Sequence, residues 1–265
     1  MSCWMISCYL QGGLGNQMFQ VAATIAAAEN CATDAVFNFE KMCLPTCDIH
    51  TRDGGNNYYR SNIFSNLNFS DNIKITKIYH EPQFKYTQIP AEDGLALYGY
   101  FQSEKYFSHY KDLIRQTFSV DDNEFLSTPY DEIISTTISV SIHVRRNDYL
   151  NLKDYHPGCG PEYYKKAVSM FPNATYIVFS DDIEWCKDNM LFLKNAHFVE
   201  ELTDVQSMLL MSRCHHHIIA NSSFSWWGAW LNNNKEKVVI APKQWFGPKA
   251  PNDTSDLYCT GWKVL

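Results

Sequence analysis

Residues 138–148 read Ile-Ser-Val-Ser-Ile-His-Val-Arg-Arg-Asn-Asp. Branched apolar residues alternate with small or polar ones as far as Val144, a pattern that predicts a half-buried β-strand. The strand stops at a polar cluster, Arg145 to Asp148. Because open α/β sheets bind ligands beyond the carboxyl ends of their strands, this cluster is a candidate binding site.

Strands and helices alternate on both sides of this stretch. C-terminal to it, the pattern predicts helices at 161–171, 204–213 and 223–232, and strands at 175–179, 216–220 and 238–241. N-terminal to it, the pattern predicts strands at 5–11, 35–39 and 95–100, helices at 17–29 and 103–118, and an irregular excursion over 41–62. This alternation predicts an α/β protein with parallel sheets. Two lobes, 1–134 and 135–265, are expected to meet near residues 119–137.

Composition narrows the class of protein. The chain has 265 residues, 45% of them hydrophobic, which is enough for a large core. A net charge of −7 argues against nucleic-acid binding, which needs a broad cationic surface. Nine irregularly spaced cysteines without a Cys-x-x-Cys pair favour a reducing cytoplasm over a disulfide framework. No signal peptide or apolar run of about 20 residues is present, so we expect no membrane span.

The segment Gly12 to Asn16 breaks the first predicted strand before a helix. It lacks the spacing of a dinucleotide fingerprint and of a P-loop. Amides at the start of the helix, including that of Gly15, would face an anion, and the side chains of Asn16 and Gln17 would add hydrogen bonds. The alternative is a turn that only lets strand and helix pack. Together with 143–148, 180–182 and 221–225, it makes four polar segments that we expect at one sheet edge.

Arg145 and Arg146 follow the strand, so their side chains should point in opposite directions. One guanidinium can then bind a diphosphate whose charge grows as its bond to a sugar breaks, while the other holds the scaffold. The alternative is a pair of surface salt bridges. His143 could equally be a hydrogen-bonded core histidine, and Asp148 a helix cap or a partner that fixes an arginine.

Asp181 and Asp182 end the next strand but lack the Asp-x-Asp spacing of a metal motif. Either carboxylate could read guanine, and either could cap a helix. The run His215 to His217 alternates across a strand and cannot converge on one ion, so we expect no metal. Asn221, Ser222, Ser223, Phe224 and Ser225 form a helix start whose hydroxyls suit a phosphate, although helix capping explains Ser222 and Ser223 equally well.

Four segments together resemble the α-1,2-fucosyltransferases, glycosyltransferase family 11. These are Gly-Gly-Leu-Gly-Asn-Gln-Met-Phe-Gln (12–20), His-Val-Arg-Arg-Asn-Asp-Tyr (143–149), Phe-Ser-Asp-Asp (179–182) and Asn-Ser-Ser-Phe-Ser-Trp-Trp (221–227). They follow in order through most of the chain. Residues from about 40 to 135 match no motif.

The resemblance implies a GT-B fold of two Rossmann-like lobes with a nucleotide-sugar cleft between them. The N-terminal lobe would bind the acceptor, and the C-terminal lobe would bind GDP-fucose without a metal or other cofactor. Transfer would invert the anomeric carbon and reach the 2-hydroxyl of a galactose in an acceptor glycan. Arg145 would contact the β-phosphate, His143 would line the nucleotide site, Asp148 would stabilise the arginine loop, and Asn16 would lie near the phosphates or the transferred sugar.

Other functions remain open at this point. A different linkage, either α-1,6 or protein O-fucosylation, fits the arginine motif, although residues 221–227 favour the α-1,2 group. A noncatalytic carbohydrate- or nucleotide-binding protein fits the many aromatic residues. The general base is not singled out, because Asp148 and Glu81 cannot be separated without geometry.

Overall fold

The structure is a computed structural model that describes residues 5–47, 56–251 and 253–265. It divides into two compact units. The first unit is Met1–Asp121 with Asp253–Cys259, and the second is Asp122–Asn252 with Thr260–Leu265. Residues 122–134 therefore group with the second unit, and the chain returns to the first unit near its end. The division predicted at 134/135 included no such return, which depends on contacts between segments far apart in sequence.

In the first unit a parallel sheet has the strand order β3-β1-β6-β5, and β2 pairs with β4 in a separate parallel ladder. The strands are β1 (Met5–Cys8), β2 (Leu10–Gly12), β3 (Asp34–Ala35), β4 (Cys43–Cys47), β5 (Lys77–His80) and β6 (Leu95–Tyr98). The helices are α1 (Leu14–Asn30), α2 (Phe39–Met42), α3 (Asn56–Ser61), η2 (Glu104–Tyr106), η3 (Ser108–Tyr110) and α4 (Lys111–Thr117).

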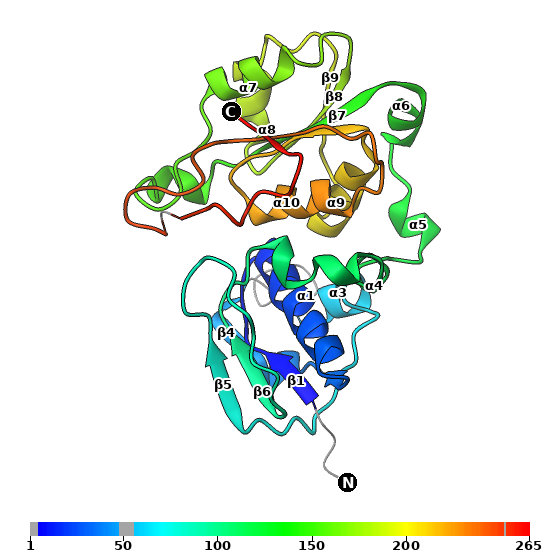
Figure 1. The fold of residues 1–265 in the computed structure, drawn as a ribbon. Helices are drawn as coiled ribbons and strands as arrows, with labels where there is room; N and C mark the ends of the chain where they lie inside the picture. The colour runs from blue at the N-terminus through cyan, green and yellow to red at the C-terminus, as the bar shows by residue number, and fades with distance from the viewer. Residues whose placement is uncertain (1–4, 48–55, 252) are drawn as a thin grey trace. The chain divides into compact units, whose positions relative to one another are not determined.

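Helix α1 forms the centre of the first unit (Figure 1). It contacts β1, β2 and β3, and its residues from Gln17 to Ala28 are all buried. Its run of alanines lets the helix lie close against the strands, because a methyl side chain occupies little space. Alanine also has the highest helix propensity, so the same residues support both the helix and its packing.

The second unit has a six-stranded parallel sheet with the order β12-β11-β10-β7-β8-β9. Its strands are β7 (Ser139–Val144), β8 (Thr175–Ser180), β9 (Ala196–Phe198), β10 (His216–Ile218), β11 (Val239–Ala241) and β12 (Lys263–Val264). Its helices are α5 (Asn123–Leu126), α6 (Asp131–Thr136), η4 (Asp148–Asn151), α7 (Pro161–Val168), α8 (Ile183–Asn189), α9 (Asp204–Arg213) and α10 (Ser223–Leu231).

Residues of β8 alternate between two hydrophobic cores, one on each face of this sheet. Tyr176 and Val178 pack in a core with Tyr164 of α7. Ile177 and Phe179 pack in the other core with α9. Helices α7 and α8 lie on one side of the sheet and α9 and α10 on the other (Figure 1). Both faces are covered, as the predicted parallel architecture requires.

Several predicted elements of the first unit differ from the structure. The predicted strand 5–11 is divided between β1 and β2, which belong to separate ladders. The predicted excursion 41–62 contains β4 and α3, while residues 48–55 lie outside the described part. Strand β5 was not predicted. All four of its residues are partly or fully exposed, so the strand lacks the apolar alternation that marks a strand in sequence.

The predicted helix 103–118 is interrupted at Phe107. This residue has φ −138° and ψ 6°, outside the helical region, and it separates η2 from η3. Its ring is fully buried, with its centroid 6.1 Å from that of Phe19 in α1. Packing of Phe107 into the core therefore overrides the helical pattern of the segment. Within the described ranges, no helix is long and apolar enough to cross a bilayer.

Candidate active site

The turn between β2 and α1 is the candidate anion site of the first unit. Gly12 has φ +73°, and a Cβ at this position would collide with the Asn16 side chain. This left-handed backbone conformation favours glycine. The N-cap residue of α1, Gly13, makes no side-chain cap hydrogen bond, and its carbonyl accepts from the N–H groups of Asn16 at 2.9 Å and Gln17 at 3.1 Å.

The three residues that follow differ in how they are placed. Asn16 Oδ1 accepts a hydrogen bond of 2.8 Å from Nε2 of Gln102. Gly15 is buried, and Gln17 is completely buried, with Nε2 donating to the Gly12 carbonyl at 2.8 Å. Its Oε1 is buried without a hydrogen-bond partner among the described residues. Its contact with a donor sugar stays a prediction, whereas its support of the Gly12 turn is observed.

The segment that carries Gln102 is held from two sides. Glu81 Oε2 accepts from the backbone N–H of Tyr100 at 2.7 Å and of Phe101 at 3.0 Å. Burial raises the pKa of Glu81, and its Oε1 is buried without a hydrogen-bond partner among the described residues. A base must reach its proton, so the observed contacts fit an anchoring role for Glu81 better than the role of general base.

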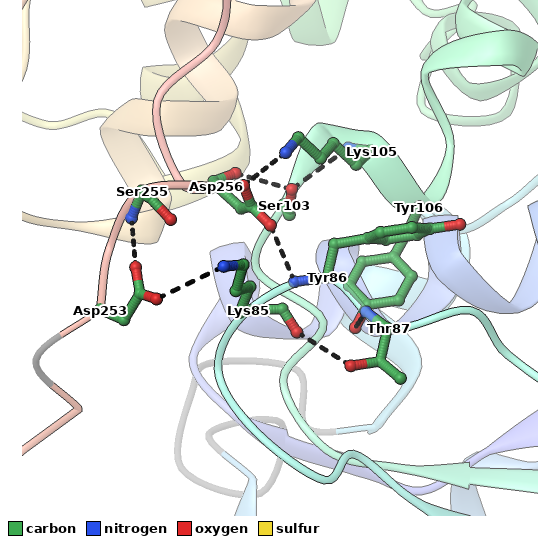
Figure 2. A network of polar contacts seen from close by, with 9 residues as sticks. All are labelled: Lys85, Tyr86, Thr87, Ser103, Lys105, Tyr106, Asp253, Ser255 and Asp256. Carbon is green, nitrogen blue, oxygen red and sulfur yellow. Dashed lines mark hydrogen bonds and ion pairs between the residues drawn. The ribbon is translucent and has the colours of Figure 1, made fainter.

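The second anchor is the returning segment at the end of the chain. Figure 2 shows Asp256 beside residues 85–87 and 103–106. Ser103 Oγ donates to the Asp256 carbonyl at 2.6 Å, and the Asp256 carboxylate pairs with Lys105 and accepts from the Tyr86 N–H at 3.1 Å. All these residues belong to the first unit, so Asp253–Cys259 completes the surroundings of Gln102.

In the second unit, β7 ends in the predicted cluster, and His143 is its last polar strand residue. Residues Val140, Ile142 and Val144 face the core around α7, so Ser139, Ser141 and His143 face the opposite side. His143 is 5% exposed, and its ring centroid lies 5.5 Å from that of Phe224 in α10. Burial and the charge of Arg145 lower the pKa of His143 to about 3, so the ring is neutral. Its Nδ1 has no partner among the described residues.

Arg145 is fixed through its Nε atom. This atom lies 3.0 Å from Asp148 Oδ1 and 3.3 Å from Asp181 Oδ2. Burial opposes the charged form, but the hydrogen bond to Asp148 and the charges of both aspartates outweigh it and raise the pKa of the guanidinium. Contacts of the described residues leave Nη1 and Nη2 without a partner. The side chain is 29% exposed, so these donors can meet an anion.

Arg146 contacts other side chains than Arg145 does. Its Nε lies 3.0 Å from Asp182 Oδ2, and its guanidinium carbon lies 3.7 Å from the centre of the Trp185 ring. Asp182 also accepts from the Trp185 N–H and so caps α8. These contacts hold Arg146 against the scaffold. The sharing of roles, with Arg145 as the diphosphate contact, stays a prediction.

Asp181 is the centre of the arginine loop. Its Oδ1 accepts from the Arg146 N–H at 2.9 Å, and its Oδ2 accepts from the Asn147 N–H at 3.2 Å and faces Arg145. Both oxygens therefore have protein partners. The Asp182 carboxylate likewise contacts the scaffold through Arg146. The prediction that Asp181 or Asp182 reads guanine stays a prediction.

The start of α10 brings the remaining predicted residues to the same sheet edge. Asn221 is 1% exposed, and its Nδ2 donates to two backbone carbonyls, of Pro157 at 2.8 Å and of Trp245 at 2.9 Å. Ser222 is the N-cap but makes no side-chain cap hydrogen bond. Ser225 Oγ donates a hydrogen bond of 3.3 Å to the Ser222 carbonyl. Ser223 and Phe224 are half-buried.

The three histidines 215–217 make hydrogen bonds to residues on or beside the neighbouring strands. His215 Nδ1 lies 2.9 Å from Ser139 Oγ, and His217 Nδ1 lies 2.8 Å from Ser141 Oγ on the neighbouring strand. His216 Nδ1 accepts from the Val238 N–H at 3.1 Å. Each ring therefore has its own partner. In the described part of the chain, no three His, Cys, Asp or Glu side chains are grouped as ligands for a metal ion.

Strands β10, β7 and β8 are adjacent and parallel, so the segments following them meet at one edge of the second unit's sheet. This edge gathers His143, Arg145 to Asp148, Asp181, Asp182 and Asn221 to Ser225. The prediction that all four segments share one edge is wrong for Gly12–Asn16, which belongs to the first unit and a different sheet. Tyr149 and Gln102 were assigned no role from sequence, although both directly follow strand-end segments.

Two fucosyltransferases of known structure share this architecture. Fucosyltransferase NodZ from Bradyrhizobium superimposes with a TM-score of 0.55 at 12% identity over 86% of this chain and 93% of its own. POFUT1 in complex with GDP-fucose gives a TM-score of 0.51 at 12% identity over 89% and 96%. These are GT-B enzymes, and the present fold is of the same class: α/β with parallel sheets.

Comparison of sequences identifies the family. The alpha-1,2-colitosyltransferase of Escherichia coli is 32% identical over 89% of this chain and 91% of its own length. The O-antigen biosynthesis glycosyltransferase WbnK of Escherichia coli is 28% identical over 97% and 99%. A galactoside 2-alpha-L-fucosyltransferase of Caenorhabditis elegans is 24% identical over 88% and 71%. The model of glycosyl transferase family 11 matches residues 2–265, and the chain belongs to this family.

Proposed function

We propose that this glycosyltransferase moves L-fucose from GDP-fucose to the 2-hydroxyl of a galactose in an acceptor glycan, with inversion and without a metal. The observation that carries the proposal is Arg145. Two carboxylates hold its Nε, and the outer nitrogens of the guanidinium have no partner among the described residues. A fixed, charged fork of donors suits a diphosphate leaving group.

In this reaction the acceptor oxygen forms a bond to the anomeric carbon as the bond from that carbon to the β-phosphate breaks. The electron pair leaves with GDP, and the acceptor hydroxyl releases its proton to water. Arg145 and the amides at the start of α10 would stabilise the charge that develops on the diphosphate. Donors that are already oriented need little rearrangement during the reaction, which is why a metal is not required by this scheme.

The names of the relatives support an α-1,2 linkage. The colitosyltransferase and the galactoside fucosyltransferase both carry it in their names. NodZ, described in one structure as an α-1,6-fucosyltransferase soaked with GDP-fucose, shares the fold at only 13% identity. We therefore retain α-1,6 transfer and protein O-fucosylation as alternatives that linkage analysis of the product decides.

A second donor has specific support. The colitosyltransferase is 32% identical to this chain, a higher value than that of the galactoside fucosyltransferase at 24%. Colitose is fucose without its 3-hydroxyl, so the two donors share the nucleotide and differ by one polar group. An enzyme that hydrogen-bonds this hydroxyl rejects the deoxy sugar strongly, whereas an apolar pocket separates the two poorly.

The test supplies GDP-fucose or GDP-colitose to the enzyme with galactose-terminated acceptors, with and without EDTA. We expect transfer of fucose, a new linkage to the galactose 2-hydroxyl by NMR, and unchanged rates in EDTA. Preferred use of GDP-colitose would assign the second donor. GDP release without a glycoside product would argue for hydrolysis, and GDP-sugar binding without either product for a noncatalytic protein. Complete loss of activity in EDTA would refute the metal-free scheme.

A further inference from the structure

Tyr149 connects the arginine loop to the start of α10. It lies in η4, four residues after Arg145, whose guanidinium carbon lies 5.7 Å from the centre of the Tyr149 ring. The Tyr149 hydroxyl donates to the backbone carbonyl of Asn221 at 2.9 Å. Burial raises the pKa of Tyr149, so the hydroxyl remains a protonated donor. One side chain thus contacts both the candidate phosphate-binding arginine and the helix start.

Asn221 is a fixed point for this hydrogen bond. It directly precedes Ser222, the N-cap of α10. Its side-chain amide donates to the carbonyls of Pro157 and Trp245, and the Cys159 thiol lies 3.5 Å from its Oδ1. With its side chain bonded on three sides and 1% of its surface exposed, Asn221 has little freedom to move. A group bonded to its carbonyl is held in place relative to α10.

A second aromatic ring supports the Tyr149 ring. His156 stacks on it with a centroid distance of 4.9 Å and an interplanar angle of 18°. The pKa of His156 is lowered, chiefly by burial, and the lower pKa favours the neutral ring. The Tyr149 ring is therefore fixed by a stack at one side and by its hydroxyl at the tip.

The loop from Arg145 to Tyr149 has separate anchors at its two ends. Asp181 accepts from the N–H groups of Arg146 and Asn147, near the start of the loop. Tyr149 supplies the anchor near its end. Without the Tyr149 hydroxyl, the loop would remain attached to β8 through Asp181 but would lose this direct bond to the residue before α10.

We infer that Tyr149 is a positioning residue for Arg145: it holds the guanidinium and the amides at the start of α10 as one rigid anion-binding surface. The inference rests on the proposed function, in which Arg145 binds the diphosphate. A misplacement of about 1 Å in such a surface lowers a rate by about 100-fold. A small tilt of the loop should therefore affect GDP binding and turnover more than it affects folding.

Tyr163 offers a matched control in the same unit. Its hydroxyl donates to the carbonyls of Ile219, at 2.7 Å, and Ile240, at 3.1 Å. These carbonyls lie at β10 and β11 rather than at the residue before α10. Tyr163→Phe and Tyr149→Phe each remove one partly buried phenol O–H, which two carbonyls share at Tyr163 and one carbonyl accepts at Tyr149. A purely structural role therefore predicts effects of similar size for both.

The experiment measures GDP affinity by calorimetry, kcat and donor KM, and urea unfolding for Tyr149→Phe, Tyr149→Leu and Tyr163→Phe. Tyr149→Phe should weaken GDP binding about 5-fold, the equivalent of one hydrogen bond. Tyr149→Leu also loses the ring and should lower kcat/KM about 100-fold. Tyr163→Phe should destabilise the fold to a similar extent as Tyr149→Phe and leave GDP affinity unchanged.

A second measurement separates positioning from stability and from the proposed function itself. In an Arg145→Ala background, Tyr149→Phe should cause no further loss of GDP affinity, because the residue that it positions is absent. Equal, additive losses in both backgrounds would overturn the inference. So would normal GDP binding by Tyr149→Phe together with weak binding by Arg145→Ala. Normal GDP binding by Arg145→Ala would overturn the proposed role of the arginine, and the inference with it.

Discussion

The turn Gly12–Asn16 and the loop Arg145–Tyr149 each follow a strand of a parallel ladder, but they are stabilised in different ways. In the first unit the contacts are between neutral groups: Gln102 donates to Asn16, and Gln17 donates to the Gly12 carbonyl. In the second unit, Asp148, Asp181 and Asp182 surround two arginines.

This difference follows from what each segment presents. The turn is a bend of the backbone, which needs only correct backbone geometry and neutral hydrogen bonds. The loop presents a guanidinium, and a partly buried cation needs nearby anions to offset its desolvation. The aspartates engage the Nε atoms of the two arginines, and under the proposed function the outer donors of Arg145 bind the diphosphate. The comparison therefore predicts large effects for changes in the charged loop and small effects for changes around the neutral turn.

The largest effect is expected for Arg145→Ala. Removal of the fixed charge should lower kcat/KM by about 1,000-fold, the scale seen when a preorganised electrostatic donor is lost. Asp181 keeps its hydrogen bonds from the Arg146 and Asn147 N–H groups, so circular dichroism and urea unfolding should show a folded protein. Arg145→Lys is the control for charge without the planar fork, and it should recover part of the activity. Near-normal turnover of Arg145→Ala would remove its central role.

Asp181→Ala should have the next largest effect. The substitution leaves the N–H groups of Arg146 and Asn147 without their acceptor and Arg145 with one fewer anion. We expect a fall of about 100-fold in kcat/KM from a displaced loop and about 2 kcal/mol in the free energy of unfolding. Asp181→Asn keeps an acceptor oxygen and loses the charge, so it should be intermediate. If both variants unfold and react like the wild type, Asp181 does not organise the loop.

The charged loop was more predictable from sequence than the segments that support it. The strand before it and helix α9 at 204–213 are local properties and appear as predicted. Arg145 and Arg146 pair with different carboxylates. Gln102, Tyr149 and Asp256 carry no local signal for their roles, because each acts on a partner tens of residues away. Even Gln17, chosen for its place beside Asn16, points inward, since helical periodicity and burial decide its direction.

Acid should lower the free energy of unfolding of the second unit, because His143 is buried in its neutral form. In the folded state its pKa is about 3, whereas an unfolded histidine titrates near 6.5. Between these values the unfolded chain binds a proton that the folded chain does not. The stabilisation is therefore complete above pH 6.5 and is lost as the pH falls, by about 2 kcal/mol at pH 5.

Urea unfolding of the wild type and His143→Gln at pH 7 and pH 5 measures this contribution. His217 is also buried with a lowered pKa, so both proteins should lose stability in acid. The loss should be smaller by about 2 kcal/mol in His143→Gln. Equal losses would show that His143 is not a neutral buried ring.

Gln102→Leu tests the neutral turn. It removes the hydrogen bond to Asn16 while keeping similar volume, and we expect donor KM to rise about 5-fold because one neutral hydrogen bond is lost. Gln83→Leu is the control, since Gln83 Nε2 donates to Thr87 Oγ1 at 3.3 Å on the exposed surface of the same unit. A loss of about 100-fold or more for Gln102→Leu would mean that the turn depends on its brace as strongly as the charged loop does.

The smallest effect is expected for Asp256→Asn in the network of Figure 2. The side chain keeps an oxygen for the Tyr86 N–H and loses its charge opposite Lys105, which is 55% exposed. Solvent screens such a pair, so the free energy of unfolding should fall by at most about 1 kcal/mol. Asp256→Ala also removes the acceptor of the Tyr86 N–H and should cost more. If urea unfolding gives equal losses for both, the charge rather than the hydrogen bond holds the returning segment, and the first unit would depend on an ion pair as the second unit does.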